Sequence, residues 1–158
     1  MKIISHRGNI NGPVEETEND PKQILFCIES GYDVEIDLRI KNGVPYLGHD
    51  HAEHEISAGW ISSLKKHLWI HVKEYDALVW LMENVPDAAF FCHESDRYTL
   101  VSNGYVWSHD LSNSMTDKCI IPLLSLEQIE SYDFTSQSNL YAVCTDYVID
   151  CNRKWTRE

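Results

Sequence analysis

No stretch of the sequence is apolar over the length that a membrane-spanning helix needs, and no two cysteines form a C-x-x-C pair. Basic residues are also few: 13 Lys and Arg stand against 25 Asp and Glu, for a formal net charge of −12. Binding a nucleic acid backbone requires a basic surface, so we expect no nucleic acid partner. The negative net charge does not exclude a phosphorylated small molecule as a ligand, because a bound cation can make an active site locally positive.

The cysteines carry no pattern typical of a metal site or a disulfide framework. Their count is odd, and most of them lie in apolar segments, which predicts reduced, buried thiols in a reducing compartment. The cysteines are Cys27, Cys92, Cys119, Cys144 and Cys151. A His-Arg-Gly element at residues 6–8 leaves no room for a cleaved leader, so we expect a cytoplasmic protein without an integral membrane segment.

Short apolar runs alternate with helical patterns along the chain. The expected strands are 2–5, 33–38, 44–47, 68–73, 88–92, 105–107, 119–121 and 141–144. The expected helices run from Asp20-Pro21 to Gly31, over 76–84 and over 126–131. The polar stretch 51–58 reads as loop, and no linker or internal repeat divides the chain. We therefore expect a single domain over residues 1–158.

This order of elements predicts an α/β protein with a parallel sheet, because its strands are nearly continuous apolar runs. Polar signatures fall at the carboxyl ends of the strands, where (β/α)8 barrel enzymes place their chemistry. Such barrels use ~250 residues, so 158 residues leave too few for eight full units. The prediction is a shortened or incomplete (β/α)8 TIM-type barrel in which several crossover helices are reduced, mainly in the second half.

The most informative motif is Glu35-Ile36-Asp37 on the second expected strand. Successive side chains of a strand alternate between faces, so the two carboxylates point to the same side. Two neighbouring carboxylates repel each other unless a cation or a shared proton neutralises them. His6 precedes this pair and His49 follows it, and two histidines can supply an acid and a base beside a bound cation.

The ordered motifs resemble those of the glycerophosphodiester phosphodiesterase family, which belongs to the phospholipase C-like phosphodiesterases with a (β/α)8 barrel. They are His6-Arg7-Gly8, Glu18-Asn19 before a helix, Glu35-Ile36-Asp37, Gly48-His49-Asp50 and Ile70-His71-Val72-Lys73. The match covers somewhat under half of the chain. Beyond residue 75 the chain is similar only to small, shortened relatives, and that part adds fold support rather than chemistry.

The resemblance implies a metal-dependent phosphodiesterase acting on a small glycerophosphodiester-like substrate of a polyol or sugar. It implies His6 and His49 as the acid and base, and Arg7 and Lys73 as cations at the phosphate. Glu18 and Asn19 are implied as substrate-side residues that orient these groups. Glu35 and Asp37 are implied as ligands of one divalent ion. The roles of the two histidines are left open between them.

The third metal carboxylate of the family lies two residues before the lysine, where this sequence has His71. We expect one divalent ion at the site, Mg²⁺ or Ca²⁺ in the first place and Mn²⁺ or Zn²⁺ as the alternatives. The alternatives arise because an imidazole removes one negative charge and moves the preference toward Mn²⁺, Zn²⁺ or iron. If His71 does not bind the ion, Glu94 or Asp96 after the next strand could complete the site. We also expect His93 to line it, and we interpret His109, Asp110 and Asp146 as surface or capping residues.

Other readings of these residues are open. Glu35 and Asp37 could pair with Arg39 and Lys41 on an exposed strand. The stretch His49-Asp50-His51-Ala52-Glu53-His54 nearly matches the dinuclear zinc motif of metallo-β-lactamase-like hydrolases, which has aspartate where this chain has Glu53. A shortened barrel could also bind a phosphorylated ligand without turning it over. An incomplete barrel would expose sheet edges that a symmetric homodimer could cover, which light scattering would test.

Overall fold

The computed structural model describes residues 1–112, 115–136 and 139–156. The strands are β1 (Lys2–His6), β2 (Asp33–Lys41), β3 (Val44–Leu47), β4 (His54–Glu55), β5 (Leu68–Val72), β6 (Ala89–Phe91), β7 (Tyr98–Leu100), β8 (Val106–Ser108), β9 (Cys119–Pro122) and β10 (Ala142–Thr145). The helices are η1, a 3-10 turn (Glu15–Thr17), α1 (Pro21–Glu29), α2 (Ala58–Leu64), α3 (Tyr75–Asn84), α4 (Leu126–Ser131) and α5 (Val148–Trp155).

The core of the fold is a curled parallel sheet in the order β6-β5-β2-β1-β10-β9-β8. The first and last strands pair at its centre, with Lys2 opposite Ala142. The two ends of the sheet approach each other beside β7, where the Ser102 N–H donates to the Phe90 carbonyl over 2.8 Å and the Phe90 N–H donates to Ser102 Oγ over 3.0 Å. A single serine thus links the ends where a further strand would close a full barrel.

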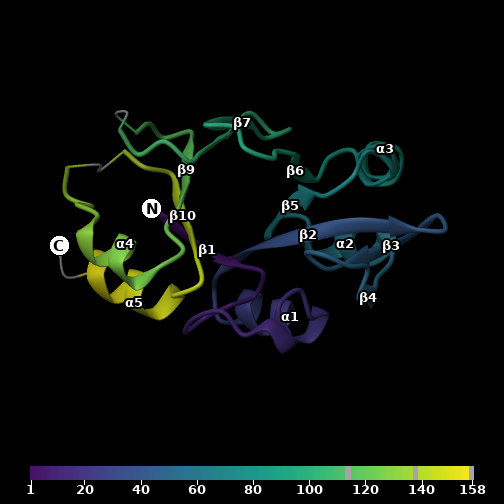
Figure 1. Ribbon diagram of the computed structural model, residues 1–158, viewed down its shortest axis with the longest axis horizontal. Coiled ribbons are helices and arrows are strands. Elements are labelled where there is room, and N and C mark those ends of the chain that lie inside the picture. The colour runs from purple at the N-terminus through teal and green to yellow at the C-terminus, as the bar shows by residue number, and fades with distance from the viewer. Residues whose placement is uncertain (113–114, 137–138, 157–158) are drawn as a thin grey trace.

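The prediction of a shortened barrel is confirmed. Helices lie outside the curled sheet beside β1, β5 and β10, while the described residues between β6 and β9 contain only the β7–β8 hairpin and loops (Figure 1). The expected strands all appear within two or three residues of their predicted ends. The sequence analysis missed α2, α5, β7 and the short β4, which falls in the stretch expected to be loop.

The ends of α1 follow the local sequence signals. The Asp20 side chain accepts from the Lys22 N–H over 2.9 Å as N-cap, and Pro21 occupies the first helical position. Gly31 ends the helix with a φ of +91°, a backbone conformation that glycine adopts without steric cost. Helix α1 therefore connects the loop after β1 to the start of β2.

Strand β2 shows why the carboxylates are internal. Its alternate residues Val34, Ile36 and Leu38 pack outward into a core formed with helices α1, α2 and α3. Glu35 and Asp37 point the other way, into the barrel, and are 2% and 0% exposed. The interpretation of these two as members of an exposed, ion-paired strand is therefore wrong, because both faces of β2 are covered.

Two further cores complete the molecule. One lies outside β1, β9 and β10 against α4 and α5, and includes Ile121, Val143 and Val148. The other fills the barrel interior with bulky side chains such as Trp69 and Trp107. Four of the free cysteines are buried as predicted and Cys92 is exposed. None of the helices within the described residues has the length and apolar composition of a membrane span.

Candidate active site

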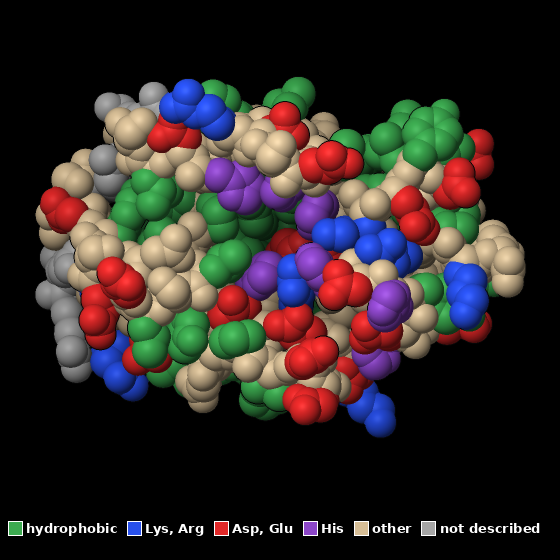
Figure 2. Space-filling model, in the orientation of Figure 1, with side chains coloured by type: hydrophobic (Ala, Val, Ile, Leu, Met, Phe, Trp, Pro, Cys, Tyr) green, Lys and Arg blue, Asp and Glu red, His purple; other side chains and the backbone are tan. Residues whose placement is uncertain are grey.

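Most of the sequence-predicted site residues line a cavity of about 380 Å³ at the carboxyl ends of the parallel strands. Its lining includes His6, Arg7, Glu35, His49, His71 and Lys73. Figure 2 shows a hollow near the centre of the molecule with histidine side chains on both sides and basic and acidic side chains beside it. Residues from four separate segments of the first half of the chain therefore face one small space.

A possible metal centre lies at the floor of this cavity. Glu35, Asp37 and His71 each offer one ligand atom, and these atoms lie within 4.8 Å of one another. The His71 Nδ1 is 3.2 Å from Asp37 Oδ1 and 3.8 Å from Glu35 Oε1. Neighbouring strands β2 and β5 create this cluster, because Asp37 and His71 are opposite each other in the parallel register.

The pKa values of the two carboxyl groups are shifted in opposite directions. Burial raises the pKa of Glu35, and the nearby Asp37 charge raises it further. Burial would also raise the pKa of Asp37, but the contact with His71 and the charges of Arg7 and Lys73 hold that pKa well below its usual range. The surroundings thus favour the ionised form of Asp37 and disfavour the ionised form of Glu35.

Arg7 and Lys73 bring positive charge to the same cluster. The Arg7 Nε lies 3.0 Å from Asp37 Oδ2, and the Lys73 Nζ lies 3.6 Å from Asp37 Oδ1. Burial would lower the pKa of Arg7, but the Asp37 and Glu35 charges outweigh it and raise that pKa. Both cations line the cavity, so an anionic ligand can meet them there.

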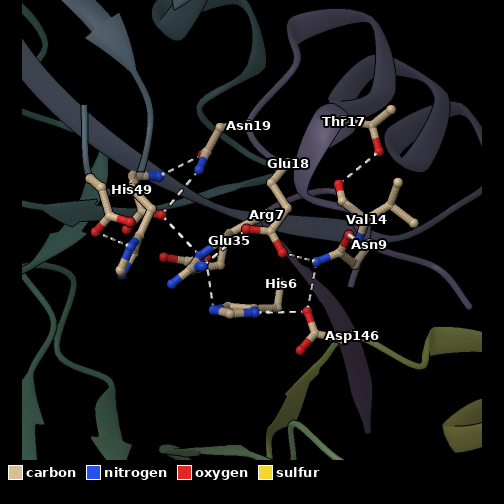
Figure 3. A network of polar contacts seen from close by, with 12 residues as sticks. His6, Arg7, Asn9, Val14, Thr17, Glu18, Asn19, Glu35, His49 and Asp146 are labelled. Atoms are coloured by element: carbon tan, nitrogen blue, oxygen red, sulfur yellow. Dashed lines mark hydrogen bonds and ion pairs between the residues drawn. The ribbon is translucent and has the colours of Figure 1, made fainter. Parts of the chain in front are cut away.

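Glu18 and Asn19 do not border the cavity, but each contacts a residue of the candidate site. The Arg7 guanidinium donates to Glu18 Oε2 over 3.0 Å, and the Asn19 amide donates to Asp37 Oδ2 over 3.1 Å (Figure 3). The Asn19 side-chain oxygen also accepts from the Asp37 N–H over 2.9 Å. These hydrogen bonds hold Arg7 and Asp37 in place, and the role of Glu18 and Asn19 toward a substrate stays a prediction.

His6 is held by a residue that the sequence analysis placed at the surface. Its Nδ1 lies 2.8 Å from Asp146 Oδ1, and its Nε2 faces Glu35 Oε2 at 3.9 Å (Figure 3). The interpretation of Asp146 as a surface or capping residue is wrong: it is buried, and its same oxygen accepts from the Asn9 amide over 2.8 Å. Burial would lower the pKa of His6, but the Asp146 hydrogen bond and the Glu35 charge raise it overall.

We expect the substitution Asp146→Asn to lower the pKa of His6, because a neutral amide no longer stabilises the imidazolium. If protonated His6 donates a proton in the reaction, the alkaline limb of the pH profile of kcat will move to lower pH. The loss of one charge-assisted hydrogen bond is expected to cost about ten- to a hundredfold in kcat. A pH profile that stays in place would contradict this role, and Asp150→Asn on the same stretch of chain is the matched control.

His49 is positioned by hydrogen bonds to the backbone of its loop, whereas His6 is positioned by a contact with its imidazole. The Arg39 guanidinium donates to the Gly48 carbonyl over 3.1 Å and to the His49 carbonyl through two of its nitrogens. Glu74 holds Arg39 at 3.3 Å and accepts the Ile40 N–H over 2.7 Å. The His49 imidazole itself pairs only with exposed Asp50, at 2.9 Å, among the described residues. Burial and the Arg7 charge lower the pKa of His49.

We expect Arg39→Met to lower kcat by about tenfold, because the loop that carries His49 loses its donors while the aliphatic stem is kept. The substitution should leave the affinity for a metal ion unchanged, since Arg39 is not among the cluster residues. Steady-state kinetics beside metal titration separates the two effects. Recovery of most of kcat in Arg39→Lys would support a hydrogen-bonding role, and an unchanged kcat in Arg39→Met would contradict it.

Gly48 permits the sharp loop before His49. Its φ is +149°, and a Cβ at this position would lie 1.9 Å from the His51 carbonyl oxygen. No side chain fits there without moving the loop. Gly48 therefore allows the backbone turn that places His49 at the cavity.

Other candidate residues divide into those that reach the cavity and those that do not. His93 and Glu94 line the cavity, whereas Asp96 lines only an adjacent cavity. His109 is exposed but also lines the cavity, although the sequence analysis interpreted His109 as a surface or capping residue. Its position two residues after the expected 105–107 strand was the available signal.

The dinuclear zinc reading of His49, His51 and His54 is not supported: among the described residues, metal-ligand side chains converge only at Glu35, Asp37 and His71.

Comparison with known proteins defines the fold. No model of a protein family matches the sequence, and no curated protein sequence matches it. A protein assigned as a glycerophosphodiester phosphodiesterase from Galdieria sulphuraria is similar in structure, with a TM-score of 0.54 and 11% sequence identity over 98% of this chain and 97% of that chain. The glycerophosphodiester phosphodiesterase from Agrobacterium tumefaciens has a TM-score of 0.53 and 15% identity over 97% of this chain and 98% of that chain. This chain thus has the fold of the glycerophosphodiester phosphodiesterases, in the form of a shortened barrel.

Proposed function

We propose that the protein is a metal-dependent phosphodiesterase that hydrolyses a small glycerophosphodiester-like substrate. The observation that carries the proposal is one cavity that combines the Glu35, Asp37 and His71 cluster with two cations and two histidines. The shared fold of glycerophosphodiester phosphodiesterases supports the same conclusion. The proposal treats residues 1–158 as one cytoplasmic phosphodiesterase domain.

The residues of the cluster fit a divalent cation. Glu35 Oε2 and Asp37 Oδ1 are buried without a hydrogen bond from the described residues, and His71 Nδ1 and Lys73 Nζ lie 3.2 Å and 3.6 Å from Asp37 Oδ1. Two neighbouring buried carboxylates repel each other, which favours a further cation between them. Two carboxylates and one imidazole suit Mn²⁺ or Zn²⁺ as well as Mg²⁺ or Ca²⁺, so we propose one divalent ion held by Glu35, Asp37 and His71. When bound, such an ion would supply positive charge against the oxygens of a phosphate.

Arg7 and Lys73 would bind the non-bridging oxygens of the phosphodiester. Negative charge builds on these oxygens as a nucleophile approaches phosphorus, and fixed cations in a shielded cavity stabilise that charge. Both side chains already have anionic partners in Asp37 and Glu18, which hold their charged ends near the cavity. Little reorganisation is then needed when a substrate binds.

The two histidines would divide the proton transfers. His49, whose pKa is lowered, would take the proton from an attacking water or a neighbouring substrate hydroxyl as the new P–O bond forms. His6, whose protonated form is stabilised by Asp146, would give its proton to the leaving oxygen as the old P–O bond breaks. The products are an alcohol and a phosphomonoester, or a cyclic phosphate when the substrate's own hydroxyl attacks.

A direct test is to incubate the protein with glycerophosphodiesters and each of the four divalent ions and to follow the phosphorus species by ³¹P NMR. Ion-dependent conversion of the diester that stops on addition of EDTA is the expected result. Phosphate-ligand binding without conversion would favour a non-catalytic binding barrel. The net charge of −12 leads us to expect no cleavage of polynucleotides, which serve as the negative control.

A further inference from the structure

A buried asparagine connects the Arg7–Glu18 pair to the His6–Asp146 pair. The Asn9 Nδ2 group donates to Glu18 Oε1 over 2.9 Å and to Asp146 Oδ1 over 2.8 Å (Figure 3). Glu18 in turn holds the Arg7 guanidinium, and Asp146 holds the His6 imidazole. Asn9 itself is only 3% exposed. One side-chain amide therefore lies between the partner of a phosphate-binding cation and the partner of the proposed acid.

The hydrogen-bond partners decide which way this amide points. Ionised carboxylates only accept hydrogen bonds, so the oxygens of Glu18 and Asp146 both require the nitrogen of the amide. The Asn9 Oδ1 accepts the Val14 N–H over 3.1 Å, and a backbone N–H only donates. Aspartate at this position would place a third carboxylate against the other two, and an aliphatic side chain would leave both oxygens without this donor. A neutral group that donates twice and accepts once suits the position.

The backbone brings His6, Arg7 and Asn9 together at the end of β1. Arg7 has a φ of +53°, a left-handed conformation that is uncommon for a residue with a side chain and that persists only where surrounding contacts hold it. The Asn9 N–H donates to the His6 carbonyl over 2.9 Å, and Ser5 Oγ donates to the Asn9 carbonyl over 2.7 Å. These backbone contacts fix the turn, whereas the side-chain amide of Asn9 fixes the two carboxylates beside it.

The two carboxylates that Asn9 joins come from distant parts of the chain. Glu18 lies in the loop before α1, and Asp146 follows β10, 137 positions after Asn9. A buried polar network whose members are all satisfied keeps its groups in one arrangement. Asn9 thus ties the carboxyl end of β10 to the loop after β1 at the point where both reach the candidate site.

We propose that Asn9 is a positioning residue that holds the Arg7–Glu18 pair and the His6–Asp146 pair in register with each other. The inference rests on the proposed function, which gives Arg7 and His6 their roles toward the phosphate and the leaving oxygen. It assigns both placements to one uncharged side chain that is not part of the cavity lining. Asn9 contacts no substrate and transfers no proton.

The test combines Asn9→Ala with two measurements that do not depend on hydrolysis. Calorimetry with inorganic phosphate in the presence of Mg²⁺ reports on Arg7, and the NMR signal of the His6 Nδ1 proton reports on the contact with Asp146. We expect Asn9→Ala to bind phosphate about three- to tenfold more weakly and to lose the His6 signal through exchange with water. The kcat for a glycerophosphodiester should fall by about ten- to a hundredfold, because small displacements of reacting groups are costly.

Ser5→Ala is the matched control for Asn9→Ala. It removes a buried hydrogen bond to the Asn9 carbonyl but leaves the side-chain amide and its two carboxylates in place. Phosphate affinity, the His6 signal and kcat should all stay at the wild-type level. Losses in Ser5→Ala equal to those in Asn9→Ala would overturn the inference, since the turn rather than the amide would then hold both pairs.

Asn9→Asp separates the proposed role from support of the loop. It keeps the acceptor for the Val14 N–H but replaces the two donors by a third carboxylate, so it should be at least as impaired as Asn9→Ala. Wild-type behaviour of Asn9→Asp would overturn the inference, because the amide donors would not be needed. The comparison of Asn9→Ala with Ser5→Ala decides the question if Asn9→Asp does not fold.

The outcomes separate this inference from the proposed function. Unchanged phosphate affinity and an unchanged His6 signal in Asn9→Ala would overturn the role of Asn9 and leave the phosphodiesterase proposal standing. A wild-type protein that neither binds phosphate nor hydrolyses a diester would overturn the proposed function. Loss of the His6 signal in Asn9→Ala would in that case still support the bridge to Asp146.

Discussion

Replacement of His6 by alanine is expected to lower kcat for a glycerophosphodiester by about 10²–10⁴-fold, the usual contribution of a positioned acid or base. The affinity for the divalent ion should change little, because His6 is not part of the Glu35, Asp37 and His71 cluster. The reason for the large effect is geometric: Asp146 fixes His6 at the cavity, and no other imidazole among the described residues is hydrogen-bonded to Asp146. Single-turnover kinetics at saturating metal measures the loss.

His51→Ala is the matched control, because this exposed histidine lies two residues from His49 but outside the cavity. It should retain wild-type kcat. A loss in His51→Ala as large as that in His6→Ala would contradict the assignment and return the zinc-hydrolase reading of His49, His51 and His54. Full activity in His6→Ala would remove His6 from the reaction altogether.

The double substitution Glu35→Gln/Asp37→Asn is expected to abolish measurable binding of a divalent ion and, with it, activity. Amides keep the shape of the carboxylates but remove both negative charges, which supply most of the attraction for a cation at this site. Isothermal titration with magnesium, calcium, manganese and zinc would show one bound ion in the wild-type protein and none in the variant. The ion with the highest affinity would show how strongly the imidazole of His71 sets selectivity.

The double variant His51→Ala/His54→Ala is the control for this titration and should bind the ion as the wild type does. Zinc retained by Glu35→Gln/Asp37→Asn but lost by the histidine control would contradict a metal centre on β2. Unfolding temperatures of the apo proteins should accompany the titrations. The apo variant should unfold at a lower temperature than the wild type, because Asp37→Asn removes the anion that pairs with Arg7 and Lys73. Relief of the repulsion that raises the pKa of Glu35 should offset part of that loss.

The parallel strands of the first half and the residues at their carboxyl ends were predictable because the signals there are local, whereas β4 and α2 were missed. Alternation in Val34-Glu35-Ile36-Asp37 predicts which side chains point inward, and Asp20-Pro21 predicts where α1 begins. Strands β1, β2 and β5 are neighbours in the sheet, so residues at their carboxyl ends meet as the motifs suggest. The gathering of His6, Glu35, Asp37 and His71 follows from these two facts together.

The second half was less predictable because its contributions are long-range. Asp146 follows β10, a strand that lies beside β1 only in the completed sheet, and no local pattern near residue 146 points to His6. His109 likewise reaches the cavity through the order of β6, β8 and β9 rather than through its own neighbours. Helix α5 was missed because its apolar positions are sparse, with Val148 and Cys151 as its buried residues.

The pairing of β1 with β10 has a consequence for how the protein is made. His6 and Asp146 are 140 positions apart, so their contact cannot form until residue 146 has left the ribosome. Contacts between such distant segments form late and slowly, because the intervening chain must first be ordered. We infer that β1 and β2 can pair while β10 is still missing from the nascent chain, so that His6 gains its contact with Asp146 only after the first half of the sheet has formed.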